Sequence, residues 1–233
     1  MKDLVKKYFK NYNIDVTELQ AEKFAKFYHF LIAENEKFNL TAITQPDEVA
    51  VKHFVDSVLP YMEIPKGACV IDVGTGGGFP GVPLKIMRDD IQIVLLDSLQ
   101  KRVKFLEEVK NLLSLSKTTC VHSRAEDYVK NNREKFDVAL SRAVAGVPTL
   151  SEYLLPYVKV GGKVMMYKGS KAEEELFDGQ KAIKEFGGKF EKMLSFKLNE
   201  VESERNIIII NKVAHTNQKY PRGKNLPKTQ PII

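Results

Sequence analysis

The chain of 233 residues has 43% hydrophobic and 28% charged side chains, a balance that fits a soluble protein with one main core. No apolar run approaches the roughly 18 residues that a membrane-spanning helix needs. The first residues, MKDLVKKYFKNY, lack the uninterrupted apolar segment of a signal peptide. We therefore expect a cytoplasmic protein without a membrane partner. Its two cysteines, Cys69 and Cys120, have no metal or redox spacing and are expected to be reduced.

Residues 1–60 are expected to form a helical extension. Between Thr17 and Lys37, apolar side chains recur at i, i+3, i+4 and i+7, which predicts an amphipathic helix. Its buried stripe would contain Phe24, Phe27, Tyr28 and Leu31. A second helix is expected to begin at Pro46, because proline fits the first turn and the acids that follow it favour a helix N-terminus. Its inner face would contain Val51, Phe54, Val55 and Val58.

From residue 68 onward, short β-branched segments alternate with helical ones. Strands are expected at residues 68–73, 91–97, 118–122, 136–141, 163–168 and 206–211, with a weaker one near 189–198. Helices fit between them at about 81–88, 99–114, 124–131, 148–158 and 171–186. This alternation predicts an α/β domain over residues 61–213, with a mostly parallel sheet and helices on both faces. The last connection is too short for a crossover helix, so the final two strands should be antiparallel.

The segment DVGTGGGFPG, residues 72–81, predicts a ligand-binding loop at the end of the first strand. Asp72 closes the strand, and Gly74, Gly76 and Gly78 alternate after it, which permits a tight turn that brings backbone amides against a ligand. In open α/β sheets, ligands lie beyond the carboxyl ends of the strands. Residues 76–81 also satisfy GxGxxG, so a nicotinamide or flavin protein and a tight turn without a ligand remain alternatives.

Residues around this loop favour S-adenosylmethionine over a dinucleotide. Pro80 and Pro83 remove amide donors at the start of the next helix, where a pyrophosphate would bind. Asp97 ends the second strand and is placed to accept from the ribose hydroxyls. After the third strand, at residues 124–127, a carboxylate can accept from the adenine amine while a backbone amide meets a ring nitrogen. Three acids after successive strands suit a cationic sulfonium, although Asp97 or Glu126 alone could also be a helix N-cap.

Other chemistries lack their motifs. No GKS or GKT follows the glycines, which excludes a P-loop, and no GxSxG indicates a hydrolase. A metal site is not expected, because no metal-ligand spacing relates the histidines His29, His53, His122 and His215.

Missing motifs also limit which atom could accept the methyl group of S-adenosylmethionine. Carbon 5 of a pyrimidine needs a thiolate, usually in a Pro-Cys pair, and neither cysteine has a neighbouring proline. An exocyclic amine is usually held by an Asn/Asp-Pro-Pro-aromatic loop after strand four, where this chain has SRAVA at residues 141–145. Guanine nitrogen 7 carries a free lone pair, so no side chain has to remove a proton from it. Arg142 is a bidentate partner for the Hoogsteen edge of guanine, and its role at the site stays open.

The positive charge is concentrated at the C-terminal end. Residues 205–233 contain six basic and no acidic side chains, which leaves 30 of each sign before them (36 − 6 = 30). Charge concentrated on a tail rich in proline, glycine and asparagine, residues 214–233, suits a polyanion. A solvated, disordered tail is the alternative.

Taken together, these segments resemble the bacterial small-subunit ribosomal RNA guanine-N(7) methyltransferases, once called glucose-inhibited division protein B. The glycine loop alone is generic. Its GFPG ending becomes specific for this family when it occurs together with the other motifs, in order along nearly the whole chain. They are FNLTAIT (38–44), HFVDSVLP (53–60), DVGTGGGFPG (72–81), LLDSLQKRVKFLEEV (95–109), SRAED (123–127), SRAVA (141–145), YKG (167–169) and KYPR (219–222).

The resemblance implies a class I (Rossmann-like) methyltransferase fold with a seven-stranded sheet and S-adenosylmethionine as the donor. The implied acceptor is guanine 527 in the 530 loop of 16S rRNA, free or in the small ribosomal subunit, and the protein would act as a monomer. Cofactor contacts are expected from Asp72, Gly74, Gly76, Gly78, Phe79, Asp97, Ala125, Glu126 and Arg142. Catalytic roles are expected for Arg142, Lys168 and His53.

The same resemblance places a further set of residues on the surrounding RNA-binding or active-site face: Asn39, His53, Asp56, Ser57, Arg102 and Lys168. His53 and Asp56 could instead simply form a pair on a helix surface. Two other functions remain alternatives. One is a nicotinamide-dependent oxidoreductase built on residues 76–81. The other is an RNA-binding accessory protein without catalytic activity.

Overall fold

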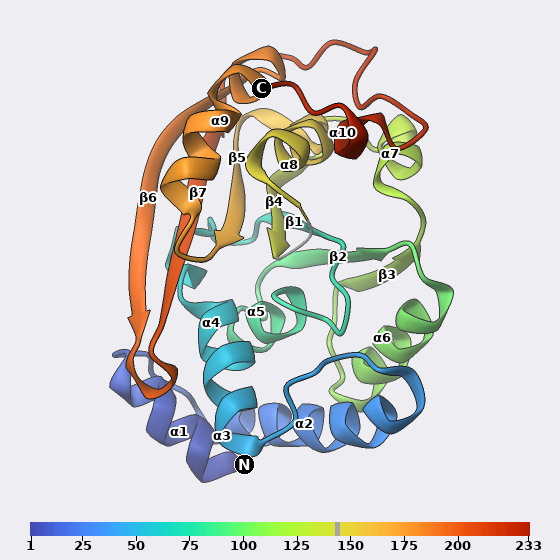
Figure 1. Ribbon diagram of the computed structural model, residues 1–233. Helices are drawn as coiled ribbons and strands as arrows, with labels where there is room; N and C mark the ends of the chain where they lie inside the picture. Colours follow the sequence, from blue (N-terminus) through green and yellow to red (C-terminus); the bar gives the residue numbers. More distant parts are fainter. Residues whose placement is uncertain (143–144) are drawn as a thin grey trace.

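A seven-stranded sheet forms the centre of the computed structural model, which describes residues 1–142 and 145–233 (Figure 1). The strand order is β3-β2-β1-β4-β5-β7-β6. The first five strands are parallel, and β7 runs antiparallel to both β5 and β6. The predicted mostly parallel sheet with an antiparallel C-terminal pair is confirmed. The strand bounds are β1 Cys69–Val73, β2 Gln92–Asp97, β3 Thr118–His122, β4 Phe136–Arg142, β5 Val158–Lys168, β6 Gly188–Leu198 and β7 Ser203–Lys212.

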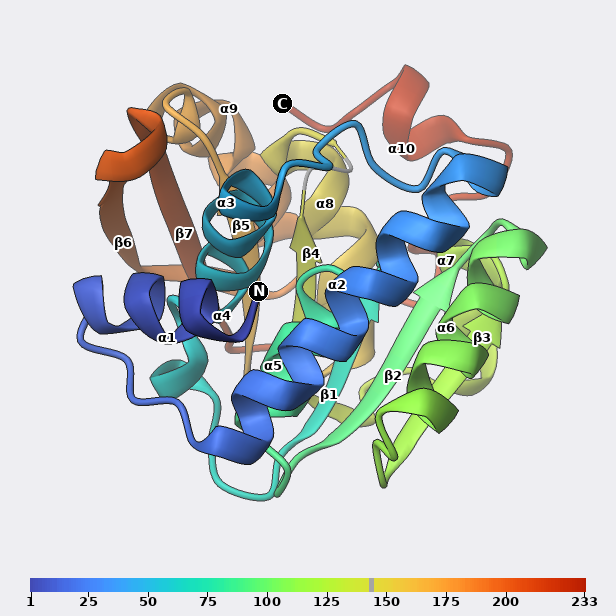
Figure 2. The ribbon, with the colours of Figure 1, turned by 90° about the horizontal axis from the view of Figure 1, so that it is seen from below.

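Helices cover both faces of the sheet (Figures 1 and 2). Buried side chains of the N-terminal helices share one apolar cluster with those of the helices after β1 and β2, so the N-terminal helices and one face of the sheet have a common core. On this face lie α1 Lys2–Asn11, α2 Glu18–Phe38, α5 Gly81–Met87 and α6 Gln100–Leu112. On the other face lie α7 Ala125–Tyr128, α8 Val147–Leu154 and α9 Ala172–Glu185, with η3 Val129–Asn131 and η4 Leu155–Tyr157. Two further short turns are η2 Tyr61–Glu63 and η5 Asn199–Val201.

Helix α2 follows the predicted pattern except at Tyr28, which is only partly buried. Thr17 and Gln20 form a capping box at its start, which satisfies two backbone amides that have no partner within the helix. Phe24, Phe27 and Leu31 are fully buried, and both phenylalanine rings pack against Phe54 in the next helical segment. The aromatic stripe therefore fixes the N-terminal helices against each other.

The segment after Pro46 differs from the single helix that the sequence predicts. It consists of α3 Pro46–Glu48, a π-helical stretch η1 Val49–Val55, and α4 Asp56–Val58. The four side chains predicted to face inward are buried. Backbone carbonyls in the π-helical stretch accept from side chains: Lys52 O from Arg142 and His53 O from Ser57 Oγ. Such side-chain bonds interrupt the regular α-helical ladder, and periodicity alone does not reveal them.

The C-terminal segment packs on the domain. Thr216, Tyr220 and Pro227 are buried, and residues Leu226–Thr229 form the short helix α10 against α8. The alternative of a disordered tail is therefore wrong for residues 216–229, although residues 217–219, 223–224 and 228–229 are exposed. Within residues 1–142 and 145–233, no helix is long and apolar enough to span a bilayer.

Candidate functional site

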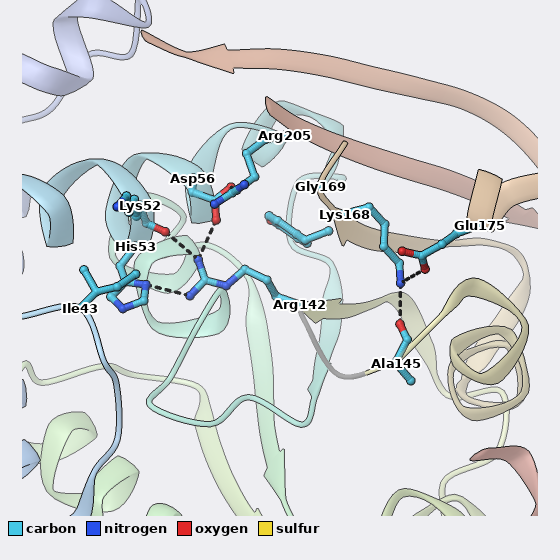
Figure 3. Close-up of a pocket in the computed structure, with 11 residues that line it drawn as sticks. Ile43, Lys52, His53, Asp56, Arg142, Ala145, Lys168, Gly169, Glu175 and Arg205 are labelled. Atoms are coloured by element: carbon cyan, nitrogen blue, oxygen red, sulfur yellow. Dashed lines mark hydrogen bonds and ion pairs between the residues drawn. The ribbon is translucent and has the colours of Figure 1, made fainter. Parts of the chain in front are cut away.

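Two cavities open beyond the carboxyl ends of the parallel strands. The first, which we name the β2 cavity, has a volume of about 400 Å³ and follows β1, β2 and β3. It is lined by Val73, Gly74, Leu96, Asp97, Ser98, Leu99, Ser123, Arg124, Ala125, Glu126, Tyr153, Asn225 and Lys228. The second, the β4 cavity, has a volume of about 560 Å³ and follows β4 and β5 beside η1. It is lined by Ile43, Lys52, His53, Asp56, Arg142, Ala145, Tyr167, Lys168, Gly169, Glu175 and Arg205 (Figure 3).

The glycine loop and Asp97 hold each other in place at the β2 cavity. Gly74, Gly76 and Gly78 have φ angles of +74°, +60° and +93°, a region that favours glycine. The Gly76 amide donates to Asp97 Oδ2 at 2.9 Å, and the Leu99 amide donates to Asp97 Oδ1 at 2.9 Å. Asp97 is thereby fixed at the end of β2 with its carboxylate at the cavity.

Asp72 lies beneath the loop. Its side chain is fully buried, and its Oδ2 accepts from the Gly81 amide at 2.8 Å. Burial raises the pKa of this carboxyl to about 6. A Cβ atom on Gly81 would come within 2.3 Å of Leu95 Cδ2 and 2.8 Å of Asp72 Oδ2. These contacts make Asp72 a support for the loop and the start of α5, and it does not line the cavity.

The far side of the β2 cavity is formed by the start of α7. Arg124 donates to Glu126 Oε1 at 2.7 Å, and the Tyr157 hydroxyl donates to Ala125 O at 2.6 Å. The Glu126 side chain is only 11% exposed. The cavity thus has carboxylates on two sides, Asp97 and Glu126, and apolar side chains between them.

Arg142 occupies the centre of the β4 cavity. Its Nη1 donates to Asp56 Oδ2 at 2.9 Å and to Ser57 Oγ at 3.3 Å, and its guanidinium carbon lies 5.0 Å from the centroid of the Phe79 ring. Asp56 is 2% exposed and also faces Arg205, whose Nε lies 3.0 Å from Asp56 Oδ1. One buried carboxylate therefore holds two arginines, one from β4 and one from β7 (Figure 3).

His53 is a neutral imidazole with both ring nitrogens engaged. Arg142 Nη2 lies 3.2 Å from its Nδ1, and Thr41 Oγ1 lies 2.8 Å from its Nε2. Because a guanidinium can only donate, Nδ1 accepts and Nε2 carries the proton. Burial, followed by the charge of Arg142, lowers the pKa of His53 to about 3. The ring stacks on Phe79 at a centroid distance of 4.3 Å, so His53 positions its neighbours and has no lone pair left to act as a base.

A lysine at the end of β5 reaches the opposite side of the β4 cavity. Lys168 Nζ donates to Glu175 Oε2 at 2.6 Å and to Ala145 O at 2.5 Å, and its side chain is 6% exposed. It ties α9 to the loop after β4 (Figure 3). The SRAVA prediction falls partly on residues 143–144, which lie outside the described residues; Ser141 Oγ donates to Val73 O at 2.9 Å and links β4 to β1.

All predicted site residues except Asn39 fall into three groups. Gly74, Asp97, Ala125 and Glu126 line the β2 cavity, whereas His53, Asp56, Arg142 and Lys168 line the β4 cavity. The remaining predicted residues support or flank them: Asp72, Gly76, Gly78 and Phe79 in or under the loop, Ser57 beneath Arg142, and Arg102 at 3.4 Å from Asp97. Asn39 is exposed at the C-cap of α2 and lines neither cavity.

Several lining residues were not predicted. Arg205 and Glu175 line the β4 cavity, and Tyr153, Asn225 and Lys228 line the β2 cavity. A signal existed only for Arg205: antiparallel pairing of the last strands with β5 places residue 206 opposite residue 168.

The strand order and the antiparallel C-terminal pair define a class I (Rossmann-like) methyltransferase fold. The O-methyltransferase from Bacillus cereus, solved in complex with SAH, matches with a TM-score of 0.58 and 15% identity, over 91% of this chain and 100% of that one. A SAM dependent methyltransferase from Aquifex aeolicus matches with a TM-score of 0.53 and 15% identity, over 77% of this chain and 97% of that one. At these identities the likeness shows the fold.

The sequence assigns the family. Residues 20–208 match the model of the rRNA small subunit methyltransferase G (GidB) family. Ribosomal RNA small subunit methyltransferase G from Desulforamulus reducens is 45% identical, over 96% of this chain and 95% of that one. The protein of that name from Lactobacillus johnsonii is 44% identical, over 95% of each chain. The chain belongs to the rRNA small subunit methyltransferase G family. This confirms the resemblance based on motifs and overturns the oxidoreductase alternative.

Proposed function

We propose that this protein transfers a methyl group from S-adenosylmethionine to nitrogen 7 of a guanine in small-subunit ribosomal RNA. The observation that carries the proposal is the pair of cavities along one edge of the sheet. The β2 cavity lies beyond the carboxyl ends of β1, β2 and β3, and the β4 cavity lies beyond those of β4 and β5. The direction in which successive strands are added to the sheet reverses between β1 and β4. A donor in one and an acceptor base in the other would meet at this switch point.

The β2 cavity fits the adenosine part of the donor. Val73, Leu96 and Ala125 offer apolar surface for an adenine ring, and Asp97 and Glu126 offer acceptors for ribose hydroxyls and the adenine amine. Its volume of about 400 Å³ lies within the range of small-molecule sites. When bound, S-adenosylmethionine supplies an electrophilic methyl group next to a positively charged sulfur.

The β4 cavity fits a base from an anionic polymer. Lys52, Arg142, Lys168 and Arg205 line it, and cations attract phosphates. Its polar side chains are already paired: His53 has both nitrogens engaged, and Asp56 holds two arginines. Among the described residues of this cavity no side chain is free to remove a proton, which suits guanine nitrogen 7, because that atom needs no deprotonation. In-line transfer then depends on alignment of donor and acceptor, and we assign this role to Arg142 and Lys168, with His53 positioning Arg142.

The remaining assignments follow from the same proposal. Guanine 527 of 16S rRNA is the proposed target, and the protein would act in the cytoplasm as a monomer. Residues 1–60 would form the helical extension, 61–213 the methyltransferase domain, and 214–233 the C-terminal segment.

Incubation with a methyl-labelled donor tests the proposal. Purified protein is incubated with either protein-free 16S rRNA or assembled small subunits, and N7-methylguanine is mapped by chemical cleavage at the modified base. We expect label at a single guanine with at least one of these substrates. No label, or label on another atom, would overturn the proposal. Binding of SAH and RNA without turnover would favour the non-catalytic accessory protein.

A further inference from the structure

The C-terminal segment returns to the β2 cavity. Asn225 and Lys228 line this cavity together with Asp97 and Glu126, although they lie about a hundred residues further along the chain. Asn225 has a φ angle of +62° and directly precedes α10 Leu226–Thr229. Figure 1 shows α10 next to α8, on the side toward α7. The cavity therefore has an outer wall that comes from the end of the chain.

A buried ion pair anchors this wall. The Glu152 side chain on α8 is 1% exposed, and three groups of Arg222 donate to it. The Arg222 amide donates to Oε1 at 2.7 Å, Nε donates to Oε1 at 2.9 Å, and Nη2 donates to Oε2 at 2.7 Å. Bidentate pairs of this kind fix geometry as well as charge. The segment is thus attached to α8 just before it reaches the cavity.

Further contacts hold the segment on both sides of this pair. Thr149 Oγ1 on α8 donates to Pro227 O at 2.8 Å within α10. Upstream, the Arg133 side chain donates to the carbonyls of Thr216 and Tyr220. Lys212, whose side chain is fully buried, donates to Leu155 O at 2.9 Å. The path from β7 to α10 is therefore defined by contacts at several points.

These contacts change the meaning of the basic C-terminal end. Lys212 and Arg222 are committed to partners inside the domain, and Arg205 pairs with Asp56 at the β4 cavity, so none of the three belongs to a free, solvated tail. Lys224 is exposed, and no partner is found for it among the described residues. Lys228 lies at the β2 cavity instead.

We propose that residues 222–229 form the outer wall of the donor site, and that Asn225 and Lys228 donate hydrogen bonds to the adenosine part of the bound cofactor. This inference rests on the proposed function. The opposite walls offer the carboxylates of Asp97 and Glu126, which only accept when ionised. Adenine also has acceptor nitrogens, and the amide of Asn225 and the ammonium of Lys228 are donors that complement them.

Calorimetry with S-adenosylhomocysteine, without RNA, tests the side-chain contacts in the full chain. The variants are Asn225→Gly, which keeps a residue suited to positive φ, and Lys228→Ala. Lys224→Ala is the matched control, because it removes the same charge from the same segment away from the cavity. We expect the Kd to rise about three- to tenfold in the two test variants, as for loss of one hydrogen bond, and to stay within twofold in the control. Kd values within twofold of wild type in both test variants would overturn the proposed hydrogen bonds from Asn225 and Lys228 to the cofactor.

Hydrogen exchange tests the wall itself. Amides of residues 222–229 should exchange more slowly in wild type when S-adenosylhomocysteine is added, with no RNA present. Unchanged amide exchange would overturn the proposal that these residues form a wall of the donor site. If wild type fails to bind S-adenosylhomocysteine at all, the proposed function falls and this inference with it, whereas normal wild-type binding with unaffected variants and unaffected exchange removes this inference alone.

Discussion

The two cavities are built in different ways. The inner part of the β2 cavity comes from short motifs at the ends of consecutive strands, in which a glycine loop and a nearby acid hold each other through backbone bonds. The β4 cavity is assembled from side chains of segments far apart in sequence, joined by Asp56 and Lys168. We infer that the first depends on backbone space and the second on charge pairing. Each variant below changes one of these properties.

The largest effect is expected for Arg142→Ala. The change removes the central group of the β4 cavity and leaves Asp56, which is 2% exposed, with one arginine. Methyl transfer should fall by about 100-fold, as when one preorganised donor is lost, and the free energy of unfolding by about 3 kcal/mol. The Kd for S-adenosylhomocysteine should change less than the rate. Single-turnover methylation, urea unfolding and calorimetry measure the three quantities.

Arg142→Lys is the control for charge alone. Lysine keeps the positive charge but cannot reach Asp56, Ser57 and His53 with one planar group. We expect it to restore part of the stability and little of the rate. A rate close to wild type would show that geometry at this position is unimportant.

Gly81→Ala should affect the β2 cavity first. The added Cβ would lie 2.3 Å from Leu95 Cδ2 and 2.8 Å from Asp72 Oδ2, so the loop must shift. We expect a loss of about 1–3 kcal/mol in the free energy of unfolding and weaker binding of S-adenosylhomocysteine. The matched control is Gly77→Ala, whose Cβ would meet its nearest neighbour, a Phe79 ring atom, at 3.5 Å. Equal effects of the two changes would contradict the steric argument.

Glu175→Gln should act on the β4 cavity alone. The change removes the negative charge beside Lys168 Nζ, now 2.6 Å from Glu175 Oε2, and leaves a cation that is 6% exposed without its ionic partner. We expect methyl transfer to fall about tenfold, equivalent to about 1.4 kcal/mol, and the Kd for S-adenosylhomocysteine to stay within twofold. Glu174→Gln, exposed on the same helix, should have no effect; a matching loss in that variant would point to helix charge as the cause.

The contrast between the cavities also explains what the sequence could predict. The strand positions, the mostly parallel sheet with its antiparallel end, and site residues such as Gly74 and Asp97 follow from local motifs and from the rule that strand ends meet at one edge. Glu175, Arg205, Asn225 and Lys228 reach the cavities through tertiary packing, which no local spacing encodes. The π-helical stretch Val49–Val55 is likewise not encoded by local periodicity, and Arg142 from β4 donates to its Lys52 carbonyl.

The smallest effect is expected for pH in wild type, because His53 at the β4 cavity and Asp72 beneath the glycine loop act with opposite signs. His53 has a folded pKa of about 3 against an ordinary value of 6.5, so the unfolded chain binds more protons below pH 6.5 and this group makes stability fall as pH falls. Asp72 has a folded pKa of about 6 against 3.8, so its contribution is full below pH 3.8 and is lost as pH rises through 6. Between pH 4 and 6, each group changes the free energy of unfolding by at most about 1.4 kcal/mol per pH unit, and the two changes have opposite signs.

Substitution should therefore expose each slope separately. His53→Gln removes the contribution of the histidine to the pH dependence of stability. In urea unfolding between pH 4 and 6, the free energy of unfolding of this variant should therefore fall more steeply with rising pH than that of wild type. Asp72→Asn keeps an oxygen that can accept from the Gly81 amide and should give the reverse, because only the histidine slope remains. If both substitutions shift the slope in the same direction, the burial of one of these groups has been assigned incorrectly. Because His53 titrates far below neutral pH, the rate of methyl transfer by wild type should show no ionisation near pH 6.5 from this residue.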